Sequence, residues 1–383
     1  MNNTSSPTPA EAMNCNMSNM TNPFFCMSIT EILEITAPQI ILIDRIVSPI
    51  WYIIGLIGNP ISAVIWLSRK ICKTNSSAVY FGSLAIVETI YLVLHFIQEL
   101  EFAWGVKTYG GKTTCELFNF LYITPQYLVP MLVLGFTTER YIAVCHPFVK
   151  EKYCTVTRAK IVIICMSALS VAIALLQIYI WAWDDKIGCV FRPDTEKFNQ
   201  VWTWFTEMLL FGFIPVSCLV INILVILEIR RLSVQSAAHG QGQTSGNAAS
   251  TTTLLCVSFY FICTLLPATV VYAIQPSVPQ GDVSLPVHTW SDDPVWSGYF
   301  SYLTIRKIVE EICLSNYATY FIIYYATGVY FRREFRSLFG LKKKRKSKGV
   351  SSRGMLSDYS IVQSNGRNTS CTETMLVDSP SDT

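Results

Sequence analysis

The stretch Thr137-Thr138-Glu139-Arg140-Tyr141-Ile142-Ala143-Val144-Cys145-His146-Pro147 decides the fold, because it places a permanent cation at the end of an apolar helical run. Cys115 lies 25 residues before Arg140. At about 1.5 Å per residue, that separation is roughly 37 Å of helix, which is one bilayer with its interfaces. A charge at the end of such a span needs a reason. Arg140 can have a functional role at this end of the span. Alternatively, the chain is an unrelated membrane protein in which this arginine only extends its charged group to the membrane interface.

The composition is that of a polytopic membrane protein. Of the 383 residues, 51% are hydrophobic and only 14% are charged, which excludes an ordinary soluble domain. Residues 1–44 contain no Lys or Arg, whereas basic residues follow at 69–73, 150–160, 230–231 and 332–348. Because basic loops face the cytoplasm, we expect a multi-pass protein of the plasma membrane with an extracellular amino terminus. We expect these basic residues to interact with lipid, and we expect no nucleic-acid partner.

The sequence argues against metal, cofactor and enzyme chemistry. The 13 cysteines form no CxxC pair, so we expect no metal site and no cofactor. The HExxH, GxSxG and Gly-rich phosphate-loop signatures of several enzyme classes do not occur, and the chain is not expected to be an enzyme. A transporter stays as an alternative, although the related halves with broken helices that many transporters have are not evident.

Apolar runs divide the chain into three parts. Residues 1–43 are predicted to be an extracellular tail, residues 44–338 a bundle of seven transmembrane helices, and residues 339–383 a cytoplasmic tail. We expect the spans near Ile46–Leu67, Ala78–Gln98, a third ending in Arg140, Ile161–Trp183, Trp204–Ile229, Thr253–Ala273 and a seventh ending at Tyr324. A short amphipathic helix is predicted on the inner surface at 328–335. The expected fold class is therefore an all-α membrane protein.

Both tails carry candidate modification and binding sites. Acceptor triplets for N-glycosylation begin at Asn2, Asn3, Asn16 and Asn19. Cys15 and Cys26 can pair or stay as free thiols, and the sequence leaves both open. No cleavable signal peptide is visible, so we expect the first span to direct insertion. The basic run at 342–348 fits anionic inner-leaflet lipid, and the Ser/Thr-rich residues 349–383 fit kinases and arrestin.

Landmarks in six of the seven spans resemble the rhodopsin-like (class A) G-protein-coupled receptors. They are Asn59 in the first span, Leu84-Ala85-Ile86-Val87-Glu88 in the second, Cys115 with Glu139-Arg140-Tyr141 in the third, Pro215 in the fifth, Phe261 to Pro267 in the sixth, and Asn316 with Tyr324 in the seventh. The Asn75-Ser76-Ser77-Ala78-Val79-Tyr80 entry to span two and the Phe321-Ile322-Ile323-Tyr324 ending resemble invertebrate receptors for FMRFamide-type neuropeptides.

The resemblance implies a role for each landmark. The residues expected to couple the receptor to a heterotrimeric G protein are Glu139, Arg140, Tyr141 and Tyr324. Cys115 would form a disulfide with Cys189, which lies between spans four and five. The residues expected to form the core switch are Asn59, Glu88, Phe261, Pro267 and Asn316.

Four departures from the family pattern leave alternatives open. Glu88 stands where the family has Asp, Leu265 where it has Trp, Ile223 where many members have Tyr, and the Tyr320-Phe321 pair where it has Asn-Pro. A signalling-poor decoy is compatible with these changes, and the family's internal sodium site is disfavoured by them. Glu88 is either a functional carboxyl at mid-depth or a protonated, hydrogen-bonded packing residue.

The ligand class follows from the residues expected at the outer half of the bundle. Tyr122 occupies the position of the amine-binding Asp of aminergic receptors, and the lysine that opsins need is missing around Cys313. What remains is a set of carboxylates: Glu99, Glu101, Glu207, Glu310 and Glu311. A cavity lined by them favours a cation. Each can instead be a water-facing residue, and Arg306 and Lys307 one turn earlier can neutralise the last two.

The candidate ligand contacts are therefore Glu99, Tyr122, Gln126, Glu207 and Glu310. Together with the resemblance, they predict a cell-surface receptor for a short basic, amidated neuropeptide with an Arg before its terminus. A small non-peptide ligand of a divergent receptor stays as the alternative.

Overall fold

The computed structural model describes residues 27, 29–69, 71–108, 110–184, 188–193, 195–238 and 245–340, with residues 196, 236–238 and 245–251 described only by their place in helices. Several predicted features lie outside these residues. They are the glycosylation sites Asn2, Asn3, Asn16 and Asn19, the cysteines Cys15 and Cys26, the basic run at 342–348 and the Ser/Thr-rich tail.

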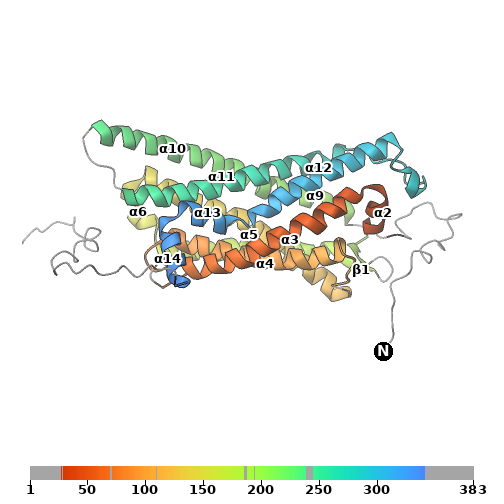
Figure 1. The fold of residues 1–383 in the computed structure, drawn as a ribbon, viewed down its shortest axis with the longest axis horizontal. Helices are drawn as coiled ribbons and strands as arrows, with labels where there is room; N and C mark the ends of the chain where they lie inside the picture. Colours follow the sequence, from red (N-terminus) through yellow and green to blue (C-terminus); the bar gives the residue numbers. More distant parts are fainter. Residues whose placement is uncertain are drawn as a thin grey trace, which may run out of the picture. The chain divides into compact units, whose positions relative to one another are not determined.

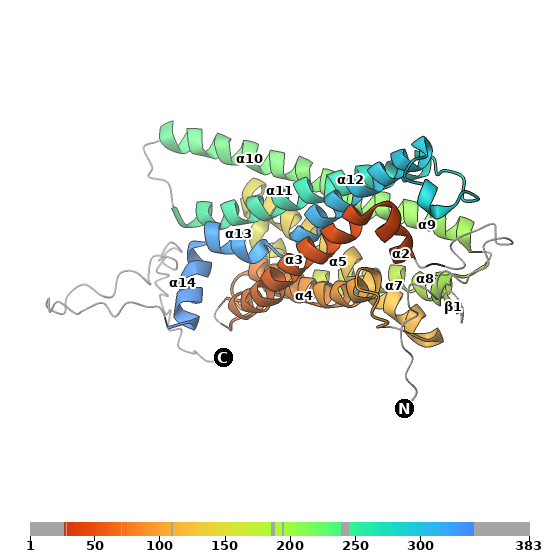
Figure 2. The ribbon, with the colours of Figure 1, turned by 45° about the vertical axis from the view of Figure 1, so that its right-hand side comes forward.

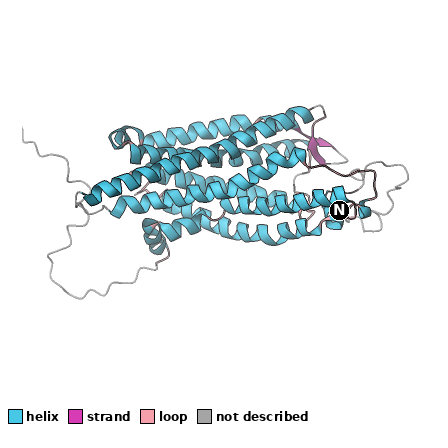
Figure 3. Ribbon diagram, turned by 90° about the horizontal axis from the view of Figure 1, so that it is seen from above, coloured by secondary structure: helices cyan, strands magenta, loops and turns pink. Residues whose placement is uncertain are grey.

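Long helices make up most of the described chain (Figure 3). Within it, six stretches are long and apolar enough to cross a membrane. The first three are α3 (Pro38–Trp66), α4 (Ser76–Phe102) and α5 (Lys112–Cys145). The fourth joins α7 (Val156–Ala174) to α8 (Leu176–Ile180), the fifth joins α9 (Glu196–Glu207), the π-helix η2 (Met208–Phe213) and α10 (Ile214–Ala238), and the sixth is α11 (Ser245–Ile274).

A seventh segment completes the bundle with two helices, α12 (Pro294–Asn316) and α13 (Tyr320–Thr327). Both helices contact α3 and α11, so the last segment lies between the first and the sixth. Its apolar character is reduced by four charged residues at 306–311, which lie in α12. The amphipathic helix α14 (Val329–Leu338) follows and buries Phe331, close to the predicted 328–335.

The helix bundle has two different ends (Figures 1 and 2). At one end lie α14 and the short helix α6 (Pro147–Tyr153), which follows α5. At the other end lie α2 (Ile29–Thr36), α9 and a hairpin of strands β1 (Trp181–Asp184) and β2 (Gly188–Phe191). The hairpin is antiparallel and pairs Trp183 with Cys189. By the predicted orientation, the hairpin end is the outer end and the α6 end is the inner one.

Several helix ends differ from the predicted span boundaries, and two of these differences have a clear reason in the packing. The first membrane helix begins at Pro38 instead of Ile46, and α2 occupies part of the predicted tail of residues 1–43. The reason is packing, because Ile32 of α2 is buried in one apolar cluster with Trp290 and Trp296 from the far end of the chain. The fourth span ends at Ile180 instead of Trp183, since the residues after Ile180 pair as β1.

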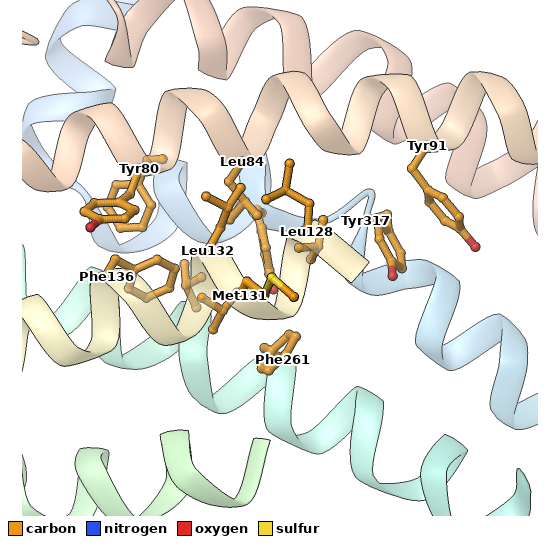
Figure 4. Packing of buried hydrophobic residues seen from close by; sticks show 14 of the residues in the cluster. Tyr80, Leu84, Tyr91, Leu128, Met131, Leu132, Phe136, Phe261 and Tyr317 are labelled. Carbon is orange, nitrogen blue, oxygen red and sulfur yellow. The ribbon is translucent and has the colours of Figure 1, made fainter. Parts of the chain in front are cut away.

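The centre of the bundle is an apolar layer shared by three helices. Leu84 of α4, Leu132 and Phe136 of α5, and Phe261 of α11 are all fully buried there (Figure 4). In a membrane, tight van der Waals packing of this kind replaces the hydrophobic effect as the force between helices. The layer therefore holds the walls of both ends in a fixed arrangement.

Close packing of α3 depends on glycine. A Cβ atom at Gly55 would lie 2.2 Å from Cδ1 of Leu92 on α4, and one at Gly58 would lie 2.7 Å from Cβ of Phe321 on α13. Only glycine allows helices to approach this closely. These two positions anchor α3 against its neighbours.

Candidate ligand pocket and coupling surface

A cavity of about 340 Å³ lies in the outer half of the bundle. Its walls come from α4, α5, α9, η2, α11 and α12. All five predicted ligand contacts line it, namely Glu99, Tyr122, Gln126, Glu207 and Glu310. These residues are up to 211 positions apart in the sequence, and in the structure they line the same cavity.

A second, larger cavity of about 1030 Å³ lies beside it and shares several of its walls. Tyr122, Gln126 and Glu207 line both cavities. The hairpin adds Trp181 and Phe191 to the larger one. A ligand larger than the inner cavity can extend along this shared wall toward the hairpin.

The predicted disulfide between Cys115 and Cys189 is present. It joins the first turn of α5 to β2, and Asn119 on the next turn donates a hydrogen bond of 3.3 Å to the sulfur of Cys189. Beyond β2, Arg192 forms an ion pair of 3.3 Å with Glu116. These contacts fix the hairpin to the outer end of α5, where it forms part of the larger cavity.

Glu310 is already occupied by partners from the protein. Its carboxylate accepts a hydrogen bond of 2.5 Å from the Tyr272 hydroxyl and one of 2.7 Å from Nε of Arg306. The ammonium of Lys307 lies 3.5 Å away. Arg306 and Lys307 therefore neutralise Glu310, which was one of the two possibilities left open by the sequence. This glutamate is less available to a ligand than predicted.

Lys307 has a second and shorter ion pair that the sequence analysis missed. Its Nζ lies 2.6 Å from Oδ1 of Asp44, whose side chain is fully buried. The predicted first span began at Ile46, so Asp44 was left in the tail. The sequence does contain a sign of its importance, because Asp44 is flanked by apolar residues, with Ile41 to Ile43 before it and Ile46 after it. A carboxylate inside an apolar run is a functional candidate.

Three acceptor oxygens at the cavity lack a donor among the described residues. They are Oε2 of Glu99, Oε2 of Glu311 and Oε1 of Gln98, and each atom is buried. Glu99 and Glu311 expose only 6% and 5% of their surface. The formal charge is also unbalanced, because five carboxylates (Asp44, Glu99, Glu207, Glu310 and Glu311) face two cations (Arg306 and Lys307).

The rest of the cavity wall is aromatic and polar. Gln126 donates a hydrogen bond of 3.0 Å to the hydroxyl of Tyr91, which lies 3.4 Å from the hydroxyl of Tyr122. His95 also lines the cavity, one turn beyond Tyr91. No sequence motif singled out Tyr91, His95 and Gln98, although their spacing of four and three residues places them on one face of α4.

The predicted coupling residues lie at the opposite end of the bundle. Glu139 is buried and accepts a short hydrogen bond from the hydroxyl of Ser76. The ring of Tyr141 packs edge-on against His146 at 5.5 Å. Tyr324 is buried, with its ring 5.5 Å from that of Trp66. Arg140 is partly buried beside Glu139.

One residue at this end was missed. Phe148 on α6 is 99% exposed, only eight positions after Arg140. Val149 and Tyr153 of the same helix are also exposed, so α6 presents an apolar surface that is a candidate contact for a partner. The sequence signal of Phe148 was its place directly after His146-Pro147, where the helix of the third span has to end.

Hydrogen bonds between neutral side chains join the inner parts of the last helices. Asn222 on α10 donates to Ser258 on α11 at 2.8 Å, and Thr327 on α13 donates to Thr253 on α11 at 3.0 Å. These two contacts connect α11 to both of its neighbours.

The predicted core-switch residues lie between the two ends. Asn59 donates a hydrogen bond of 2.7 Å to the carbonyl oxygen of Tyr317, and Asn316 accepts one of 2.6 Å from the hydroxyl of Tyr320. Phe261 is fully buried and Pro267 lies inside α11. Glu88 is buried, and neither of its oxygens accepts a hydrogen bond from the described residues. The hydrogen-bonded packing role considered for Glu88 therefore finds no partner among the described residues.

Comparison with protein families decides what kind of bundle this is. Residues 59–303, more than half of the chain, match the family model described as 7 transmembrane receptor (rhodopsin family). The chain belongs to the rhodopsin family of seven-transmembrane receptors. Membership confirms the predicted seven-helix membrane fold and the prediction of a receptor instead of an enzyme.

Individual members of the rhodopsin family are similar to the chain over shorter segments. The neuromedin U receptor homolog nmur-2 of Caenorhabditis elegans is 28% identical over 156 residues, which cover 40% of this chain and 37% of the relative. Neurotensin receptor type 1 of Rattus norvegicus is 31% identical over 131 residues (33% and 30%), and the pyrokinin-1 receptor of Drosophila melanogaster is 29% identical over 127 residues (33% and 29%). The chain thus spans about a third of the length of each of these three relatives.

Proposed function

We propose that this rhodopsin-family receptor lies in the plasma membrane with its amino terminus outside, binds a short basic peptide in the outer cavity, and relays binding to a heterotrimeric G protein. The relatives support a peptide ligand, since they are named as receptors for neuromedin U, neurotensin and pyrokinin. The narrower resemblance to FMRFamide-type receptors, with an Arg before an amidated terminus, stays part of the proposal.

One observation carries the ligand chemistry. The side chains of Glu99, Glu311 and Gln98 line the cavity, and one buried oxygen of each has no donor among the described residues. A buried acceptor without a donor costs free energy, and a buried carboxylate costs more than a neutral group. A guanidinium supplies five donors in a rigid fork and a positive charge. An Arg side chain of the ligand therefore complements the cavity better than a Lys side chain does.

The contacts within the cavity rank its carboxylates as ligand partners. Glu310 already binds Arg306 and Tyr272, so a second cation there would have to displace a partner. Glu99 has an oxygen without a donor in the described part of the chain. Glu207 lines both cavities and interacts electrostatically with Arg306, but it forms no ion pair with a described residue. We therefore place the ligand cation between Glu99 and Glu207.

The opposite end supports coupling to a G protein. Glu139, Arg140, Tyr141 and Tyr324 gather there, away from the ligand cavity, and Phe148 stands exposed beside them. Kinases and arrestin acting on residues 349–383, and anionic lipid at 342–348, complete the proposed partners. The departures at Glu88 and Leu265 keep a signalling-poor decoy as the second candidate, because both lie in the core between the two ends.

The test begins with cells that express the chain. A panel of amidated peptides is applied, and calcium and cyclic-nucleotide responses are recorded. For an active peptide, we expect Glu207→Gln or Glu99→Gln to lower potency by at least roughly tenfold, because losing one partner of a buried charge pair costs about 2–5 kcal/mol. Replacing the peptide Arg by Glu should abolish the response in the parent, and Glu207→Lys or Glu99→Lys should restore it.

A matched control lies on the same helix. Glu101 binds Thr108 at 3.0 Å and lines neither cavity, so Glu101→Gln should leave potency unchanged. The peptide assignment fails if peptides without a cation are equally potent and all three Gln variants behave alike. Binding of the peptide without any response would instead support the decoy.

A further inference from the structure

Helix α3 lines no part of the ligand cavity, yet it presents a polar stripe toward it. Asp44, Ser48 and Tyr52 are spaced four residues apart, which places them on one face of the helix. All three are buried, with exposures of 1%, 1% and 6%. The other faces of α3 are apolar and lie on the outside of the bundle, where Ile46, Ile50 and Ile53 are exposed.

Each member of the stripe holds one residue of the cavity wall. Asp44 forms the ion pair of 2.6 Å with Lys307. Ser48 donates a hydrogen bond of 2.7 Å to Oε1 of Glu311. The hydroxyl of Tyr52 lies 2.7 Å from Nδ1 of His95. The three partners, Lys307, Glu311 and His95, all line the cavity and come from two different helices, α12 and α4.

We propose that Asp44, Ser48 and Tyr52 are positioning residues of the ligand cavity: they set its electrostatic potential by fixing where Lys307, Glu311 and His95 point. The proposal rests on the proposed function only in treating this cavity as the ligand site. It adds that a helix without any ligand contact determines how strongly the cavity attracts a cation.

Lys307 shows why fixing a side chain matters here. Its ammonium is on a flexible stem and lies between Asp44 at 2.6 Å and Glu310 at 3.5 Å. Lys307 also interacts electrostatically with Glu99 on α4. Without Asp44, the ammonium is free to turn fully toward Glu310 and Glu99 and to occupy the carboxylates that a ligand cation needs. Asp44 thus keeps the protein's own cation from competing with the ligand.

A purely structural role for the stripe has less support, because α3 is already held elsewhere. Gly55 and Gly58 allow its close contact with α4 and α13, and Asn59 binds the carbonyl oxygen of Tyr317. These contacts lie toward the middle of the bundle, away from the stripe. Single-atom changes at positions 48 and 52 should therefore leave the helix in place.

The test measures the potential of the cavity without any peptide. Cys313 lines the cavity and is the only cysteine between Arg306 and Arg332, so its modification can be followed by mass spectrometry of that segment. The full chain in lipid nanodiscs is treated with cationic 2-aminoethyl or anionic 2-sulfonatoethyl methanethiosulfonate. The ratio of the two rates at Cys313 reports the local potential, since the two reagents differ mainly in charge.

We expect the parent to react faster with the cation. Asp44→Asn should lower the rate ratio, and Lys307→Met should raise it. The exchanged pair Asp44→Lys with Lys307→Asp should return it to within about twofold of the parent, because both charge and pairing are restored. Ser48→Ala and Tyr52→Phe remove one oxygen and no charge, so a changed ratio there, by about twofold or more, reports positioning alone.

Ser62→Ala is the matched control. Ser62 is a buried serine of the same helix, but its hydroxyl binds the carbonyl oxygen of Gly58 at 2.9 Å and holds no cavity residue. The proposal is wrong if Ser48→Ala and Tyr52→Phe shift the ratio no more than Ser62→Ala does. These variants also carry the test if Asp44→Asn fails to fold. Because no peptide is used, failure of the peptide screen leaves this result standing, and the reverse also holds.

Discussion

At the scale of single residues, two glutamates of one cavity illustrate different uses of the same side chain. Glu310 is bound by Tyr272 and Arg306, whereas Glu207 forms no ion pair with the described residues. Both are carboxylates near the outer end of apolar helices, but only Glu310 has basic residues one turn earlier in the sequence. The difference lies in the neighbours, because Glu310 has Arg306 one turn earlier on its own helix and Tyr272 on α11.

This difference predicts that replacing Glu by Gln has different effects at the two positions. Glu310→Gln leaves Arg306 and Lys307 with a weakened partner in a partly buried site, which should cost about 2 kcal/mol or more and lower the thermal midpoint of the purified receptor. Glu207→Gln should leave the midpoint unchanged and lower peptide potency. Equal thermal midpoints for both variants would contradict the assignment of Glu310 as an internal counter-ion.

At the scale of elements, the hairpin depends on its disulfide. The bridge from Cys115 to Cys189 fixes β2 to α5, and a reduced chain would lose that constraint together with part of the wall of the larger cavity. Cys115→Ser and Cys189→Ser should therefore each reduce the amount of receptor at the cell surface several-fold, as measured by flow cytometry. Cys165→Ser, at an exposed free thiol of α7, serves as the control and should reach the surface normally.

The short helix α6 makes a separate prediction about coupling. Phe148 is 99% exposed on it, so truncation removes no internal packing. Phe148→Ala should keep surface level and peptide affinity but reduce G-protein activation by about tenfold, if loss of an apolar anchor costs about 1.4 kcal/mol or more at the partner interface. Phe213→Ala, at an exposed position of η2 in the fifth membrane segment, should have no such effect. Unchanged activation in the Phe148 variant would remove α6 from the coupling surface.

At the scale of the whole molecule, the two ends of the bundle must face opposite sides of the membrane. Basic residues follow the first, third, fifth and seventh segments, which predicts that α6 and α14 lie in the cytoplasm. An epitope tag before residue 1 should stain intact cells, and a tag after residue 383 should stain only permeabilised cells. Staining of the second tag on intact cells would reverse the topology and place the ligand cavity on the wrong side.

The sequence alone determined the membrane class, the number of spans and the residues that mark each end of the bundle. It did so because the bilayer imposes one length and one composition on every span, and because a cysteine and an arginine at opposite ends of α5 need only local spacing. The three glutamates among the candidate contacts followed from the charge of a side chain in an apolar helix, whereas Tyr122 followed from the family resemblance.

Only the tertiary structure decided which polar and charged side chains pair between different helices, and which helix positions those of the cavity wall. The pairs of Asp44 with Lys307 and of Ser48 with Glu311 join residues more than 260 positions apart. The place of α2 against Trp290 and Trp296 is likewise a long-range contact. Local spacing carries no information about such contacts, because they depend on how the first and last membrane segments meet when the bundle closes.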